Sequence, residues 1–205
     1  MALSVEWYFD FVSPYSYIAL YRLREIPAPI VYKPVLFAGL LNHFGQKGPA
    51  EIPAKRRWTY RWCHWWAKEL GVPFRFPASH PFNPLHHLRL ALACDSRPEA
   101  VKRIFESIWM RGEDATDPAR FSKLCADLKV DASRLAEVKD VLRKNTEEAA
   151  ARGVFGVPSF VADGEVFWGA DSIELLKAFL RDPGVLRNEE MRRLDALPAA
   201  AARKS

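Results

Sequence analysis

A hydroxyl group stands where a strand-like segment gives way to a helix-like one, in the run Phe11-Val12-Ser13-Pro14-Tyr15-Ser16. Serine is a favoured helix N-cap and proline suits the first helical position, so a helix is predicted to begin here. The N–H groups of a helix start carry partial positive charge and can hold an anion, including a thiolate that a ligand brings. The local sequence alone favours the simpler interpretation, a structural N-cap, because such caps are common.

A second feature, Gly156-Val157-Pro158-Ser159, precedes an expected strand near the end of the chain. A cis peptide bond before Pro158 would point the free backbone groups of Val157 at the Ser13 turn. Only about 5% of bonds to proline are cis in folded proteins. The prediction of a cis bond therefore depends on the surrounding fold.

The elements expected around these features follow the order β-α-β, a block of helices, and β-β-α. Alternating and β-branched residues predict strands at 3–11, 29–35, 159–162 and 165–168. Asp163-Gly164 is a strong signal for a two-residue hairpin between the last two strands. Apolar spacing, caps and stops predict helices at 14–26, 54–70, 85–95, 98–111, 117–128, 133–152 and 172–180, with a short apolar segment at 37–44.

This order is that of the thioredoxin plan: an α/β, thioredoxin-like fold (β-α-β … β-β-α) with a large all-helical insertion. We expect residues 1–36 and 153–182 to form the thioredoxin-like domain and 37–152 to form the inserted helical domain. The charged, Ala-rich residues 183–205 form a C-terminal tail.

The turn into the first helix is the position at which thioredoxin-like redox proteins carry Cys-x-x-Cys. Here Ser13 and Ser16 replace both thiols, which disfavours a dithiol oxidoreductase. The three cysteines, Cys63, Cys94 and Cys125, are far apart in sequence, so reduced and mostly buried thiols are predicted.

Composition and motifs exclude several other classes of protein. The 205 residues are 49% hydrophobic and 27% charged, with 30 basic and 25 acidic side chains, as expected of an ordinary globular domain with a mild excess of positive charge. No apolar run reaches the roughly 18 residues of a membrane span, and the N-terminus does not resemble a secretory signal, so a cytoplasmic protein is predicted. No nucleotide-binding loop or metal-ligand spacing occurs, and no metal site is predicted.

Three separated motifs carry a family resemblance: Phe9–Ser16, Phe155–Phe160 and Trp168–Asp171. Together they resemble the 2-hydroxychromene-2-carboxylate isomerases, which belong with the kappa-class glutathione transferases in the wider DsbA-like group. The resemblance covers about residues 3–182. It implies glutathione as the cofactor.

Residue by residue, the resemblance places Ser13 at the glutathione sulfur and Val157 along the cysteinyl part, beside a cis Pro158. The stretch around the γ-glutamyl end matches Trp168, Gly169, Ala170 and Asp171, followed by Ser172, where family members often have arginine. Asp171 can accept hydrogen bonds from an ammonium group.

The weaker matches concern the substrate. Gln46 falls where the family tends to have asparagine, and Lys55 falls on the first turn of a long helix where a family lysine also occurs. Asn83, in a proline-rich loop, is predicted to overhang the cleft, although a plain turn role is the alternative. Leu41 stands where the naphthalene-pathway isomerases have a substrate-binding lysine, a departure that concerns the substrate rather than glutathione.

The implied reaction interconverts 2-hydroxychromene-2-carboxylate and trans-o-hydroxybenzylidenepyruvate in naphthalene-type aromatic catabolism. Reversible addition of a thiolate turns a double bond into a single bond, which rotates before elimination restores the alkene. The helix start and a hydrogen bond from Ser13 would favour the thiolate. The alternatives are a kappa-like glutathione transferase acting on another electrophile and a non-catalytic binding module. The expected partners are a small aromatic carboxylate and a second copy in a homodimer, with no nucleic acid and no membrane.

The helix predicted at 54–70 carries an unusual group of tryptophans. Trp58, Trp62, Trp65 and Trp66 recur at the spacing of one helix face, which favours core packing. An aromatic wall for a flat bicyclic substrate is the functional alternative. Binding of single-stranded nucleic acid would need exposed rings and is disfavoured by the expected burial.

Overall fold

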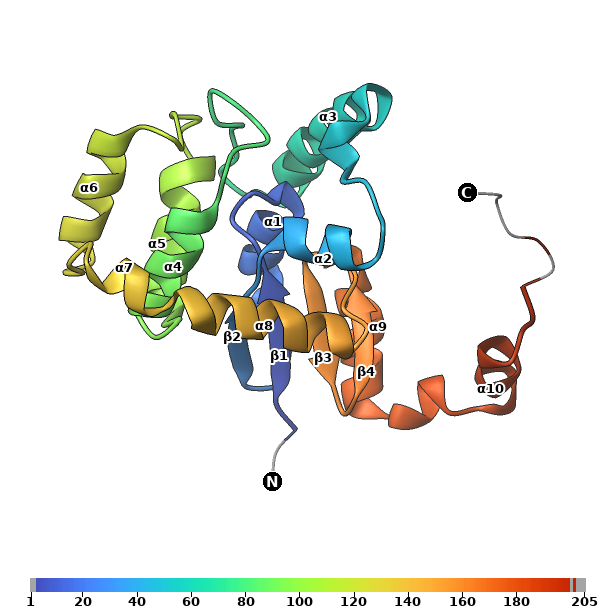
Figure 1. Cartoon of the computed structure of the whole chain (residues 1–205). Coiled ribbons are helices and arrows are strands. Elements are labelled where there is room, and N and C mark those ends of the chain that lie inside the picture. The colour runs from blue at the N-terminus through green and yellow to red at the C-terminus, as the bar shows by residue number, and fades with distance from the viewer. Residues whose placement is uncertain (1–2, 200, 202–205) are drawn as a thin grey trace.

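The computed structural model describes residues 3–199 and 201 (Figure 1). Residues 1, 2, 200 and 202–205, which belong to the predicted thioredoxin-like domain and tail, lie outside the described residues.

Four strands form one mixed sheet in the order β2-β1-β3-β4. They are β1 (Val5–Phe9), β2 (Ile30–Pro34), β3 (Ser159–Ala162) and β4 (Glu165–Trp168). β1 runs parallel to β2 and antiparallel to β3, which runs antiparallel to β4. The ends of β1, β2 and β4 and the start of β3 therefore lie at one edge of the sheet. This is the thioredoxin-like sheet that the sequence predicts.

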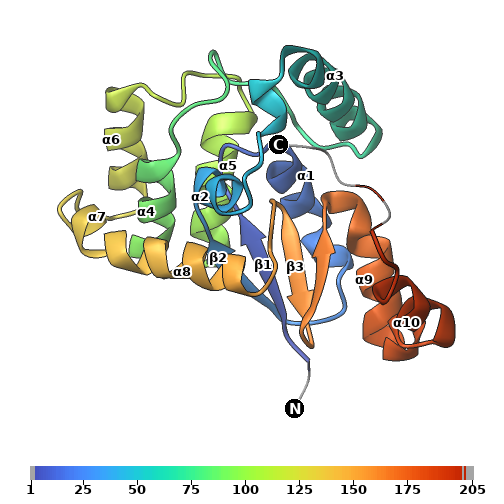
Figure 2. The same ribbon diagram turned by 45° about the vertical axis from the view of Figure 1, so that its right-hand side comes forward.

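The helices fall into four groups along the chain. Helix α1 (Pro14–Arg22) connects β1 to β2 through η1 (Leu23–Glu25), and η3 (Ala170–Ser172) and α9 (Ile173–Arg181) follow β4. Between β2 and β3 lie α2 (Phe37–His43), η2 (Pro49–Glu51), α3 (Pro53–Glu69), α4 (Leu85–Ala93), α5 (Pro98–Trp109), α6 (Pro118–Asp127), α7 (Arg134–Glu137) and α8 (Lys139–Ala151). The chain continues through η4 (Pro183–Leu186) into α10 (Glu189–Asp195), which lies away from the sheet (Figures 1 and 2).

Helices cover both faces of the sheet, because successive side chains of a strand point to opposite faces. Trp7 and Phe9 of β1 pack against the helices of one face, where Phe105 of α5 contacts both rings. Tyr8, between them, belongs to a smaller cluster with residues of α2 and α8, and α8 crosses the other face (Figure 2). Because the larger core contains side chains of β1, α1 and α5 together, it runs across the predicted boundary between the thioredoxin-like and helical domains. That division remains a prediction.

Local signals explain most element ends. The hairpin predicted at Asp163-Gly164 is present, with both residues at positive φ (48° and 83°) as a tight two-residue turn requires. The single helix predicted at 133–152 is instead two helices, α7 and α8, which meet at Val138 with ψ of 5°. The tail contains a short helix, α10, that begins after Asn188, whose side chain accepts a hydrogen bond from Met191 N. Within the described residues, no helix combines the length and apolar character needed to cross a membrane.

Candidate active site

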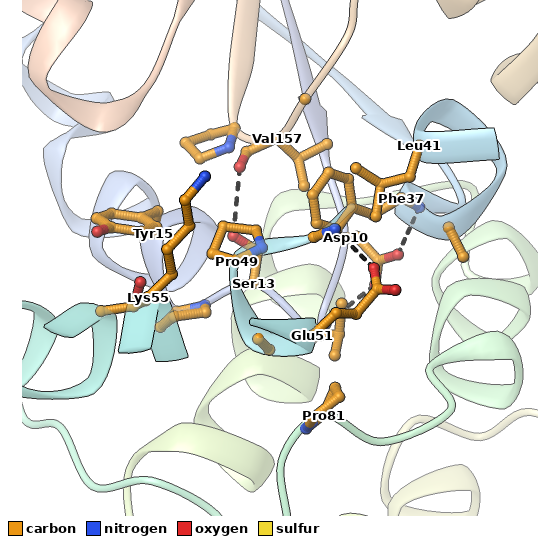
Figure 3. A pocket seen from close by; sticks show the side chains of 18 of the residues that line it. Asp10, Ser13, Tyr15, Phe37, Leu41, Pro49, Glu51, Lys55, Pro81 and Val157 are labelled. Atoms are coloured by element: carbon orange, nitrogen blue, oxygen red, sulfur yellow. Dashed lines mark hydrogen bonds between the residues drawn. The ribbon is translucent and has the colours of Figure 1, made fainter. Parts of the chain in front are cut away.

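A cavity of about 800 Å³ opens at the edge of the sheet where β1, β2 and β4 end. Its wall comes from the turn before α1, the start of α2, the segment from Gln46 into α3, the loop at His80–Pro84 and the two segments that flank β3 and β4. Figure 3 shows side chains of these elements around the cavity. Elements distant in sequence therefore meet around one space.

Ser13 lies at the centre of this arrangement and is almost fully buried (6% exposed). Its Oγ accepts a hydrogen bond from Ser16 N at 3.1 Å, which makes it the N-cap of α1. The same hydroxyl donates to the carbonyl of Val157 at 3.4 Å (Figure 3). The Val157–Pro158 peptide bond is cis. The two features identified in the sequence thus meet face to face, and Ser13 is both an N-cap and a residue of the cavity wall.

The segment after β4 forms a tight turn beside Val157. Gly169 has φ of 95°, a conformation that other residues rarely adopt, and its N–H donates to Pro158 O at 2.9 Å. Trp168 is 57% exposed and packs beside Gly156, where an added Cβ would lie 2.7 Å from the indole nitrogen. Asp171 is exposed and lines the cavity.

Arg22 of α1 holds this turn from behind. Its NH1 group donates to the carbonyl of Ala170 at 2.8 Å, and its guanidinium forms ion pairs with Glu25 and Glu174. The sequence does not predict a role for Arg22, because its partners Ala170 and Glu174 are distant in sequence.

Asp10 is a second residue whose place in the site the sequence does not predict. It is fully buried, lines the cavity and accepts hydrogen bonds from Val12 N at 3.0 Å and Phe37 N at 2.8 Å. Burial raises the pKa of this carboxyl to about 7, and the backbone N–H groups oppose the increase. Asp10 therefore joins the end of β1, the Ser13 turn and the start of α2.

His80 supports the same turn from the loop after α3. Its Nε2 lies 2.8 Å from the carbonyl of Val12, and its Nδ1 lies 2.7 Å from the hydroxyl of Tyr60. A carbonyl can only accept, so Nε2 carries a hydrogen. Burial lowers the pKa of His80, which favours the neutral ring. The one hydrogen of the Tyr60 hydroxyl is then shared between Nδ1 and the carbonyl of His80, which lies 2.8 Å away.

A family model described as a DSBA-like thioredoxin domain matches residues 4–181. The chain belongs to this family. A 2-hydroxychromene-2-carboxylate isomerase of Sphingobium xenophagum is 30% identical over 195 residues, covering 89% of this chain and 100% of the relative. Glutathione S-transferase kappa 2 of Caenorhabditis elegans is 30% identical, covering 87% of this chain and 92% of the relative. Within the DsbA-like family, the chain therefore groups with these isomerases and kappa-class transferases.

Solved structures agree on the fold. A 2-hydroxychromene-2-carboxylate isomerase superposes with a TM-score of 0.74 at 22% identity, over 95% of this chain and all of that one. The disulfide reductase DsbM of Pseudomonas aeruginosa, solved with GSH, superposes with a TM-score of 0.56 at 16% identity, over 94% of this chain and 100% of that one.

The DsbA-like fold brings most of the predicted site residues to one cavity. These are Ser13, Gln46, Lys55, Val157, Pro158, Trp168, Gly169 and Asp171, with Leu41 beside them. Ala170 and Ser172 lie behind this wall. Ala170 is fully buried, and the Ser172 hydroxyl donates to Gly169 O at 2.7 Å, so both shape the turn.

Asn83 does not lie in the cavity wall, contrary to its expected place over the cleft. Its side chain is exposed and accepts a hydrogen bond from Leu85 N at 3.1 Å, the turn role that the sequence also allows. The neighbouring Phe82 and Pro84 reach the cavity instead.

The prediction that the tryptophans of α3 face the core holds for Trp66, which is half-buried and packs against the main core, and is wrong for the other three. Trp58 is 65% exposed, Trp65 is 49% exposed and Trp62 is 36% exposed. The buried face of α3 consists of smaller side chains, Cys63 and Ala67. Periodicity identifies a helix face but not which face is covered.

The cysteines are free and buried, as predicted. Burial raises the pKa of Cys63 to about 12. Across residues 3–199 and 201, no group of three or more His, Cys, Asp or Glu side chains is arranged to hold a metal ion.

Proposed function

We propose that the chain is a glutathione-dependent isomerase that interconverts 2-hydroxychromene-2-carboxylate and trans-o-hydroxybenzylidenepyruvate. The observation that carries the proposal is the Ser13 hydroxyl, at the N-terminus of α1 and facing Val157, in the wall of an 800 Å³ cavity. The 30% identity to the Sphingobium isomerase supports the reaction type. A cytoplasmic homodimer active in naphthalene-type aromatic catabolism is part of the same proposal.

The residues present fit glutathione. The main chain of Val157 would pair with the cysteinyl part, and the γ-glutamyl end would lie at the Gly169 turn. Glycine suits that turn because φ at Gly169 is 95°, and an added Cβ would displace the Asp171 carboxylate. Asp171 would accept hydrogen bonds from the ammonium group, and Lys55 would bind a carboxylate. Bound glutathione would supply a thiolate that adds reversibly to the alkene of the substrate.

Ser13 would donate its hydrogen bond to that sulfur in place of Val157 O, whose present distance of 3.4 Å is long. The N–H groups of the first turn of α1 add partial positive charge at the same point. Both effects favour the charged form of a thiol whose free pKa is about 8.5. No histidine is available as a base for Ser13, because both nitrogens of His80 are occupied by Val12 and Tyr60.

The remaining wall suits an aromatic carboxylate. Phe37, Leu41, Trp62, Trp66 and Phe82 provide apolar surface, and Lys55 reaches into the cavity beside Tyr15 and Val157 (Figure 3). Lys55 is our choice for the group that anchors the substrate carboxylate, followed by Gln46.

A kappa-like glutathione transferase is the second candidate, favoured by one observation. Leu41 places an apolar side chain in the cavity wall at the position of a substrate-binding lysine in the naphthalene-pathway isomerases. The same glutathione site could therefore serve a different electrophile. A non-catalytic binding module is the third candidate.

Turnover assays distinguish the candidates. The chromene acid and a chlorinated nitroaromatic acceptor are each incubated with the protein, with and without glutathione. Glutathione-dependent isomerisation of the chromene acid supports the first proposal. Glutathione-dependent turnover of the nitroaromatic acceptor, without isomerisation of the chromene acid, supports the transferase. If calorimetry shows no glutathione binding to the wild type, the binding module remains.

Asp171→Ala should weaken glutathione binding, and Lys55→Ala should lower kcat/KM about tenfold to a hundredfold while changing glutathione affinity much less.

Ser13→Ala tests the assigned role directly. The variant should keep the fold but raise the pKa of the bound thiol. This pKa is measured from the thiolate absorbance at about 240 nm as pH rises through the free value of about 8.5. Ser16→Ala is the matched control, because Ser16 is fully buried next to the site and does not line the cavity. An unchanged titration in Ser13→Ala would contradict the role.

A further inference from the structure

The tryptophans of α3 form a continuous row of aromatic rings, here called the tryptophan ladder (Trp58, Trp62, Trp65 and Trp66). Trp62 is its central member. Its ring lies 6.2 Å from that of Trp58, 5.1 Å from that of Trp65 and 6.2 Å from that of Trp66. The planes of Trp58 and Trp62 are within 15° of parallel. A flat molecule can extend along such a row.

One end of the ladder lies in the cavity and the other in solvent. Lys55, Thr59, Trp62 and Trp66 share one face of α3 and line the cavity. Trp58 and Trp65 do not line it, and they are the most exposed tryptophans of the helix. The wall of the proposed substrate site thus continues outward through Trp62 onto the surface.

Exposure of several tryptophans side by side is unusual, because each indole offers a large apolar area that water does not solvate well. A cluster of this kind marks a ligand or partner site rather than a solvated surface. Its position at the mouth of the cavity indicates a ligand of that cavity.

The neighbouring face of α3 is basic. Arg57, Arg61 and Lys68 follow one another along the helix and are exposed, and none forms an ion pair within the described residues. α3 carries five basic side chains and one acidic one, Glu69, and this excess of positive charge beside an aromatic surface favours the approach of an anionic aromatic compound. Charge and shape therefore indicate the same class of ligand.

We propose that the tryptophan ladder is an outer subsite for the distal rings of a polycyclic aromatic carboxylate with three or more fused rings. The carboxylate end and the reacting bond occupy the cavity, and the additional rings stack on Trp62, Trp58 and Trp65. This inference rests on the proposed function for the reaction, but the stacking itself needs only the carboxylate and the rings.

The first experiment measures binding by calorimetry on the full chain saturated with glutathione. The probes are benzoate, 2-naphthoate and anthracene-2-carboxylate, which differ in ring number. We expect affinity to rise about tenfold from the two-ring to the three-ring acid, the size of effect expected when a ring contacts two aromatic side chains. Trp58→Ala combined with Trp65→Ala should abolish this increase and leave the affinity for 2-naphthoate within about twofold.

A matched control removes exposed apolar surface elsewhere. Leu175→Ala on α9, where the side chain is 43% exposed, should leave all three affinities unchanged. The corresponding kinetic test compares kcat/KM for 2-hydroxychromene-2-carboxylate and its benzo-fused homologue. In the Trp58/Trp65 double variant, kcat/KM should fall for the benzo-fused homologue and stay unchanged for 2-hydroxychromene-2-carboxylate.

The outcomes separate this inference from the proposed function. Ring-dependent binding without glutathione-dependent turnover would overturn the isomerase and leave the outer subsite. Two results would overturn the subsite while the two-ring acid is still turned over. One is a binding affinity that does not rise with ring number, and the other is an equal loss of kcat/KM for both substrates in the double variant. A wild-type dimer that sedimentation shows to dissociate in the double variant would assign the ladder to a subunit interface and also overturn it.

Discussion

The two serines of the turn before α1 differ in what surrounds their hydroxyl groups. Ser13 faces the cavity and has two partners, whereas the Oγ of Ser16 is fully buried and has none within the described part of the chain. Ser16 stands where a dithiol protein has its second cysteine. The Ser16 hydroxyl is thus buried away from water at a position that offers it no hydrogen-bond partner.

Ser16→Ala is therefore expected to stabilise the protein. Burial of an unpartnered hydroxyl costs roughly 1–3 kcal/mol, and alanine is the better helix former. We expect the free energy of unfolding to rise by about 1 kcal/mol, a shift of about 2–4 °C in Tm for a chain of this length. Ser159→Ala is the control, because the buried Ser159 hydroxyl donates to Gly156 O at 2.7 Å and its loss should destabilise. Equal destabilisation by both changes would contradict this account.

Asp10 gives the protein a pH dependence of stability. Its pKa is raised to about 7 in the folded chain, whereas an unfolded aspartate titrates near about 3.9. Between these values the folded state binds more protons than the unfolded state, so stability falls as pH rises from about 4 to about 7 and then levels off. Asp10→Asn should remove this component, up to about 1.4 kcal/mol per pH unit.

Urea unfolding of wild type and Asp10→Asn at pH 5, 6 and 7 measures the difference. The comparison cancels the other titrating groups, which the two proteins share. Parallel stability curves would show that Asp10 does not titrate in this range.

At the scale of elements, α1 positions both halves of the proposed glutathione site. Its first residues form the Ser13 turn, and Arg22 in its last turn holds η3 through Ala170. Arg22→Ala should thus weaken glutathione binding about tenfold, the loss expected for a charged hydrogen bond that positions Asp171. Glu174→Gln removes the exposed ion pairs of Glu174 with Arg22 and Lys177 but keeps the bond from Arg22 to Ala170, so it should change affinity little. Calorimetry of both variants checks the prediction, and equal weakening would refute it.

The elements themselves were largely predictable from sequence, because caps and stops are local. Ser13-Pro14 begins α1 and Asp163-Gly164 forms the hairpin, as expected. Which surfaces are covered was less predictable. The spacing of the α3 tryptophans places them on one face of the helix whether that face is buried or exposed. Whether another helix packs on that face depends on residues far away in sequence.

The same limit applies within the site. Ser13 and Val157 were identified because their motifs resemble those of the family, whereas the local sequence alone favours a plain N-cap at Ser13. Asp10 and Arg22 were not, because an acidic residue at a strand end and an arginine at a helix end are ordinary until the fold supplies Phe37 and Ala170 as partners.

At the scale of the whole molecule, one core joins the sheet and the inserted helices. Phe105 of α5 lies 4.5 Å from Phe11 and 5.6 Å from Phe9, between ring centroids. We expect a single unfolding transition, with far-UV circular dichroism and tryptophan fluorescence coincident in urea. Phe105→Ala should lower the unfolding free energy by about 3–5 kcal/mol and shift both signals together. Two separate transitions would instead support independent domains.

The buried cysteines have a practical consequence for a protein whose Ser-Pro-Tyr-Ser turn carries no thiol. Cys63, Cys94 and Cys125 are inaccessible, and the pKa of each is raised by burial, so alkylating reagents and mild oxidants find no thiolate on the chain. If the nucleophile arrives with glutathione, it is renewed with each molecule that binds. Reagents that permanently inactivate cysteine enzymes would then react with glutathione and leave the protein unmodified. Activity would depend on the supply of reduced glutathione and not on earlier exposure of the protein to such reagents.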